Sequence, residues 1–180
     1  MGNYYEGSLC LPVKKDIPLD ILSTLLSIPD SSDKPMHYIA DKFKGMKMFD
    51  KGKYKPIVEV YIRFTTEAEE PGYIHMFSNS LYEIDECKNS GHEIEGFDIN
   101  LAFLCKTGWE EFYKDLAESW FNILQDYIDI EYIENKNVLT PSDVYKVTYK
   151  FGEVHDEDGY YDMAFVLNEN KEPEIIKFIY

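Results

Sequence analysis

One amphipathic stretch in the second half of the chain places the strongest constraint on its fold. Large apolar side chains recur there at helical spacing, namely Trp109, Phe112, Tyr113, Leu116, Trp120, Ile123, Leu124 and Tyr127. The stretch opens on Thr107-Gly108-Trp109-Glu110, a capping box in which threonine and glutamate side chains bind free backbone N–H groups. This pattern predicts a long amphipathic helix over about 108–129. Burial of its apolar stripe contributes on the order of 10 kcal/mol before the entropy cost, so we expect this helix to organise the fold.

The N-terminal third predicts two strands and a short helix. Apolar and polar side chains alternate over 4–13 and again over 57–66, as they do in strands with one buried face. Between these strands, Asp16 suits the start of a helix and Pro29 suits its end. The predicted helix covers about 17–28.

The other apolar segments predict further strands. Four short segments precede the long helix, at 73–77, 81–86, 92–97 and 101–105. Three segments follow it, at 144–154, 160–167 and 175–180. Their polar connections predict a three-stranded antiparallel meander at the C-terminus. We therefore expect an α+β fold, in which the helices at about 108–129 and 17–28 pack on a mainly antiparallel sheet.

The chain length predicts a single domain, covering 1–180. A connection at about 30–56 has little periodicity and contains seven lysines between Lys34 and Lys55, so we expect it to be flexible. The three cysteines form no C-x-x-C pair, which favours a reduced, cytoplasmic setting. No apolar run approaches the ~20 residues of a membrane span, and the oligomeric state stays open.

The negative charge is concentrated in one part of the chain. The whole chain has 34 acidic and 18 basic residues, a net charge of −16, and residues 64–134 alone contain 17 acidic and 3 basic residues. A direct nucleic-acid or anionic-membrane ligand is not expected, because both require a basic surface. This acidic block has two interpretations. It is either a solvated face that maintains solubility or a surface whose carboxylates bind a basic partner.

We expect a basic protein partner to contact carboxylates at two places. The polar face of the predicted long helix offers Glu110, Glu111, Asp115, Glu118, Asp126 and Asp129. A turn after the second predicted strand offers Glu67, Glu69 and Glu70. The helical spacing allows carboxylates to lie along a line, as phosphates do along a nucleic-acid backbone.

The preferred hypothesis is a non-enzymatic inhibitor that occupies the nucleic-acid-binding surface of a basic protein. Phage anti-defence proteins of the anti-CRISPR kind and immunity proteins against nuclease toxins act in this way, and the analogy rests on charge and size alone. Electrostatic attraction would make the association fast and sensitive to salt.

The sequence shows no recognisable catalytic or metal-binding motif. Its four histidines form no H-x-x-x-H pair, and neither G-x-S-x-G nor a phosphate-binding glycine loop occurs. We therefore assign no catalytic residue, metal ligand or cofactor. Two alternatives stay open: a small metal-dependent enzyme that uses the carboxylates near His155–Asp162, and a structural protein that associates with itself. Asp158-Gly159 is a hairpin signal, which favours a solvated loop over a calcium site there.

Overall fold

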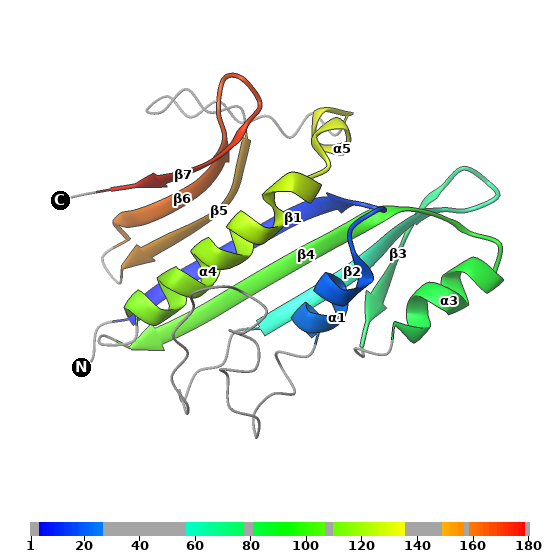
Figure 1. Cartoon of the computed structure of the whole chain (residues 1–180), viewed down its shortest axis with the longest axis horizontal. Coiled ribbons are helices and arrows are strands. Elements are labelled where there is room, and N and C mark those ends of the chain that lie inside the picture. The colour runs from blue at the N-terminus through cyan, green and yellow to red at the C-terminus, as the bar shows by residue number, and fades with distance from the viewer. Residues whose placement is uncertain are drawn as a thin grey trace.

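The structure is a computed structural model that describes residues 4–26, 57–77, 81–106, 110–135, 149–156 and 159–178. The described strands form one antiparallel sheet of seven strands, in the order β3-β2-β4-β1-β5-β6-β7 (Figure 1). They are β1 (Tyr4–Lys14), β2 (Ile57–Thr65), β3 (Pro71–Met76), β4 (Glu93–Lys106), β5 (Tyr149–Asp156), β6 (Tyr161–Leu167) and β7 (Pro173–Lys177). The described helical segments are α1 (Leu19–Leu26), α3 (Tyr82–Asn89), α4 (Glu110–Leu124), the 3-10 helix η2 (Gln125–Tyr127) and α5 (Ile130–Asn135).

The two longest strands, β1 and β4, form the centre of the sheet. They pair from Tyr4 opposite Lys106 to Lys14 opposite Gly96. One face of this pair is buried and consists of Leu9, Leu11, Val13, Phe97, Ile99, Leu101 and Phe103. These residues alternate with more polar ones, because successive side chains of a strand point to opposite faces.

Helices cover the buried face of the sheet. Figure 1 shows α4 along β1 and α1 beside β2, so the helices form a second layer. Among the side chains of α4 that the structure describes, Leu116, Ala117, Trp120, Phe121 and Leu124 are buried. This α+β architecture with an antiparallel sheet confirms the predicted fold class, although the sheet contributes more of the structure than the helices do.

The prediction that α4 continues to about residue 129 is not borne out. The helix ends at Leu124, and a β-bridge then joins Ile128 to Val13 of β1. The backbone N–H of Asp129 donates to the carbonyl of Pro12 at 2.8 Å. The Asp129 side chain accepts the Tyr132 N–H at 3.1 Å and so caps α5. Because of these backbone contacts with β1, α4 does not continue, and a separate helix, α5, begins at Ile130.

Two predictions about short strands are wrong. Residues 82–89 form α3, because Ile84 and Cys87 are buried on one side of a helical turn. The segments predicted at 92–97 and 101–105 belong to one strand of 14 residues, β4. The polar Asp98 and Asn100 between them lie on the face opposite α1 and α4, so they do not interrupt the strand.

The predicted C-terminal meander is confirmed by the sequential pairing of β5, β6 and β7. The short helix predicted at about 17–28 appears as α1, and the last two of these residues lie outside the described residues. The lysine-rich connection at about 30–56 lies outside the described residues. None of the described helices combines the length and apolar character needed to cross a membrane.

Arg63, the single arginine of the chain, is 2 % exposed and lies on the face of β2 opposite α1 and α4. Its Nε lies 3.1 Å from Asp98 Oδ1, and its Nη2 lies 2.9 Å from Asp129 Oδ2. Nη2 also donates to the Val13 carbonyl at 3.0 Å. The centre of the Tyr132 ring lies 3.6 Å from the guanidinium carbon, a cation–π contact. The arginine therefore ties α5 to β1, β2 and β4.

Gly96 of β4 makes room for this guanidinium. It is the register partner of Arg63, and a Cβ atom at position 96 would lie 2.5 Å from the Val13 carbonyl oxygen and closer still to Arg63 Nη2. We expect Gly96→Ala to lower the free energy of unfolding by about 3 kcal/mol, because it displaces a buried, paired charge. Chemical denaturation monitored by circular dichroism measures this loss.

Gly159→Ala is the matched control for this substitution. Gly159 has a φ of 81° and no other atom within 4 Å of an added Cβ. Its substitution should cost only about 1 kcal/mol, from backbone strain alone. Equal losses for the two variants would contradict the role given to Gly96.

Candidate functional site

The acidic residues of 64–134 divide into those with a cation partner and those without. Four of them lie within 3.5 Å of a lysine or arginine nitrogen, in the pairs Glu93–Lys15, Asp98–Arg63, Asp129–Arg63 and Glu118–Lys177. Ten exposed carboxylates have no such pair with any described cation: Glu67, Glu69, Glu70, Asp85, Glu86, Glu95, Glu111, Asp115, Asp126 and Glu131. Within the described part of the chain, these ten are the groups available to an external cation.

One group of carboxylates lies at the end of the sheet where β2 turns into β3. We call it the acidic end and define it as Glu67, Glu69, Glu70, Glu93 and Glu95. The turn is closed by the Thr66 N–H donating to the Glu70 carbonyl at 2.9 Å. Pairing of Thr65 with Glu93, and a hydrogen bond from the Thr65 hydroxyl to Glu95, place the start of β4 beside this turn. Of these five carboxylates, Glu93 alone has a described lysine partner, Lys15, at 3.4 Å.

A second group lies on α4. Glu111, Asp115 and Glu118 follow each other at helical spacing on one side of the helix, and we call these three residues the α4 row. Glu118 is paired with Lys177 of β7 at 2.8 Å. Burial raises the pKa of Asp115, and repulsion from Glu111 and Glu118 raises it further, while Lys177 opposes the shift. The row is therefore a place where like charges repel one another in the folded chain.

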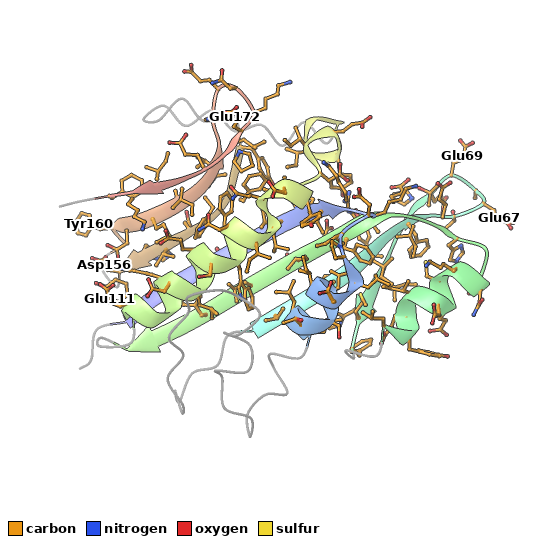
Figure 2. The ribbon with its side chains drawn as sticks, viewed as in Figure 1. Glu67, Glu69, Glu111, Asp156, Tyr160 and Glu172 are labelled. Carbon is orange, nitrogen blue, oxygen red and sulfur yellow. The ribbon has the colours of Figure 1, made fainter. Side chains whose placement is uncertain are left out.

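The structure does not bring all the predicted contact residues onto one line. Asp129 is turned toward Arg63, and Asp126 lies beyond the end of α4, in η2. Glu110 begins α4, but its side chain lies outside the described residues. Figure 2 shows Glu67 and Glu69 at the opposite end of the molecule from Glu111. The acidic end and the α4 row are thus two separate surfaces.

An aromatic cluster on β2 and β3 was not among the residues singled out from the sequence. The ring of His75 stacks on Tyr61 at 4.7 Å between centroids and meets Phe77 edge-on at 4.4 Å. Phe77 is 77 % exposed, and Tyr73 is 49 % exposed. Burial raises the pKa of Tyr61, and the charge of Glu59 with its hydrogen bond to the phenol raises it further. The alternation of residues 73–77 indicated a strand, but only the sheet order shows that this strand is at an edge.

The hairpin between β5 and β6 does not gather its carboxylates at one point. Asp156 accepts the Tyr160 N–H at 2.9 Å, which closes the turn. Asp162 instead lies 2.6 Å from Lys114 of α4. Within the described part of the chain, no three histidine, cysteine, aspartate or glutamate side chains are placed to hold a metal ion. Glu157 and Asp158 lie outside that part.

In comparisons with known proteins, no family model matches the chain, and no curated protein or solved structure matches it.

The α4 row predicts a pH-dependent effect of Asp115→Asn. Because the pKa of Asp115 is raised in the folded state, its contribution to stability falls as the pH rises from the pKa of the unfolded chain to that of the folded chain. We therefore expect the variant to be more stable than the wild type at neutral pH by a few tenths of a kcal/mol, because surface charges are screened. Denaturation at neutral pH and in acid, where the gain should vanish, measures this effect.

Asp126→Asn is the control, because Asp126 is also exposed but lies outside the row. Its substitution should leave stability unchanged within about 0.5 kcal/mol. A loss of stability in Asp115→Asn at neutral pH would show that the row is not repulsive.

Proposed function

We propose that this chain is a non-enzymatic, cytoplasmic binding protein that inhibits a basic protein by occupying its nucleic-acid-binding surface. The observation that carries the proposal is the set of ten exposed carboxylates in residues 64–134 that pair with no described cation. These carboxylates repel one another in the isolated chain, and lysine and arginine side chains of a partner relieve that repulsion.

The acidic end is the better candidate for the main contact. Only one of its five carboxylates, Glu93, has a described ion-pair partner, whereas one of the three in the α4 row, Glu118, has one. The acidic end also projects from the sheet at a turn, as Figure 2 shows for Glu67 and Glu69. A projecting cluster of carboxylates has access to a groove that otherwise holds phosphates. The α4 row would then attract the partner from a distance and speed the association.

The net charge of −16 also favours a basic partner over a second copy of the chain. Two copies of the chain repel each other over distances up to about a Debye length, so a contact between acidic surfaces of two copies is unfavourable. A basic protein is attracted electrostatically to the same surface, and its association rate falls as salt is added.

The triple variant Glu67→Gln, Glu69→Gln, Glu70→Gln tests the proposal. The immobilised full chain is used to retain proteins from a bacterial lysate at low salt, and the retained protein is identified and purified. We expect a basic nucleic-acid-binding protein that high salt or added DNA releases. The triple variant should bind this protein about tenfold or more weakly, because it removes three charges from the contact.

Glu169→Gln, Glu172→Gln, Glu174→Gln is the control with the same change in net charge. These residues lie on and beside the turn between β6 and β7, away from the acidic end (Figure 2). The control variant should retain nearly the full affinity. Retention of no basic protein, or binding that neither salt nor DNA weakens, would refute the proposal and favour the interpretation of a solvating surface.

A further inference from the structure

The two most exposed aromatic side chains of the described part of the chain lie where β3 ends and α3 begins. Phe77 directly follows β3 and is 77 % exposed, and Tyr82 begins α3 and is 63 % exposed. The N–H of Phe77 donates to Glu83 Oε1 at 3.1 Å, which places the end of β3 at the first turn of α3. Large aromatic side chains that stay exposed in one region are typical of surfaces that bind another protein.

Tyr82 shares its side of α3 with two carboxylates. Asp85 and Glu86 follow it by three and four residues, a spacing that makes side chains neighbours on a helix. Ile84 and Cys87 are buried on the other side, so the side with Tyr82, Asp85 and Glu86 is exposed. Neither of these two carboxylates forms an ion pair with a described lysine or arginine. We call Tyr82, Asp85 and Glu86 the α3 face.

The chain itself shows what a tyrosine and an aspartate at this spacing bind. Asp129 and Tyr132 are also three residues apart, at the start of α5, and both contact Arg63. Asp129 Oδ2 lies 2.9 Å from Nη2 of the arginine, and the centre of the Tyr132 ring lies 3.6 Å from its guanidinium carbon. The planar guanidinium stacks on a ring while its N–H groups bind a carboxylate. The α3 face offers the same two groups, in the reverse order along the chain and exposed to solvent.

An arginine from another protein is the occupant that fits the α3 face. The single arginine of this chain, Arg63, is 2 % exposed, so a second copy of the chain has none to offer. Lys88, the one lysine of α3, forms no ion pair with Asp85 or Glu86. The negative charge of the α3 face is therefore left for a cation from outside, which a basic protein supplies.

The α3 face lies close enough to the acidic end for one partner to contact both. α3 leads through Gly91 into β4, and a Cβ atom at Gly91 would lie 3.9 Å from Glu67 Oε1. The C-terminal end of α3 therefore adjoins the acidic end. Tyr82 begins the helix roughly 12 Å away, the length of an eight-residue helix. Figure 1 shows α3 beside β3, at the same end of the sheet.

We propose that the α3 face binds an arginine side chain of the basic partner, while the acidic end provides the main contact. The guanidinium stacks on Tyr82 and donates to the carboxylates of Asp85 and Glu86, and Phe77 adds a second ring beside the first turn of the helix. This inference rests on the proposed function, because it names the side chain by which the basic partner is recognised. It goes beyond charge, since lysine binds a carboxylate as a point charge and lacks the planar group that stacks.

Two synthetic peptides of equal length and charge test the proposal with the full chain at low salt. One carries several arginines separated by glycine and serine, and the other carries lysines at the same positions. Isothermal titration calorimetry gives the two dissociation constants, and NMR shows which amides respond. We expect the arginine peptide to bind about threefold more tightly than the lysine peptide, because the guanidinium stacks on an exposed ring, and to shift the amide signals of the α3 face.

Tyr82→Ala separates stacking from charge, because it removes the ring and leaves the net charge unchanged. The variant should lose the preference for arginine and bind both peptides about as the wild type binds the lysine peptide. Tyr160→Ala is the matched control, because Tyr160 is also an exposed aromatic residue but lies at the end of the molecule opposite α3 (Figures 1 and 2). This control should keep the preference, and equal losses in the two variants would overturn the proposal.

Asp85→Asn with Glu86→Gln tests the carboxylates of the α3 face. We expect this double variant to weaken binding of the arginine peptide by about threefold or more, because it removes two charges from the contact. Glu172→Gln with Glu174→Gln makes the same change in net charge beside β7, where both residues are exposed. Equal losses in the two double variants would show that the peptide responds to overall charge and would overturn the proposal.

The outcomes separate this inference from the proposed function. If the wild type binds both peptides equally, or if Tyr82→Ala keeps the preference for arginine, the inference is overturned and a charge-driven function survives. If the preference depends on Tyr82 but the chain retains no basic protein from a lysate, the arginine-binding face is supported and the proposed function fails. If light scattering shows a dimer whose dilution shifts the amide signals of the α3 face, a second copy occupies it and the inference is overturned.

Discussion

The buried guanidinium of Arg63 is the interaction on which the arrangement of the chain after α4 depends. A buried charge is tolerated only when opposite charges and hydrogen-bond acceptors surround it, and Asp98, Asp129 and the Val13 carbonyl supply these. Because Asp129 also caps α5, the ion pair fixes where the path of α4 ends and where α5 begins. The same contact holds α5 on the face opposite α4, where Tyr132 reaches Tyr73 on the edge strand.

This interaction also determines which acidic residues are left for a partner. It uses two carboxylates of the acidic block internally, and Lys15 and Lys177 pair with two more. Six of the unpaired ones lie at the acidic end and along α4, which are separate surfaces, and the other four lie on α3, η2 and α5. The proposed inhibitor would therefore use a strongly charged end for the main contact and a second surface for attraction. The β3 edge lies close to the acidic end, because the turn that carries Glu67 and Glu69 leads directly into β3.

Local patterns were sufficient to predict the strands with a regular alternation and the meander that closes the chain. They failed where a distant contact decides the outcome. The end of α4 depends on the β-bridge between Ile128 and Val13, and the position of Asp129 depends on Arg63, which lies 66 residues away. The residues of α3 resemble a strand in apolar content, yet burial of Ile84 and Cys87 follows a helical period. The edge position of β3 follows from the sheet order, which no local pattern encodes.

Competition with nucleic acid tests the central claim most directly. A fluorescent oligonucleotide bound to the purified basic partner is titrated with the full chain at low salt, and fluorescence anisotropy reports how much oligonucleotide stays bound. If the chain occupies the nucleic-acid-binding surface, the anisotropy falls to that of the free oligonucleotide as the chain saturates the partner. An unchanged anisotropy, with the chain bound to the same partner in a parallel measurement, would contradict the claim.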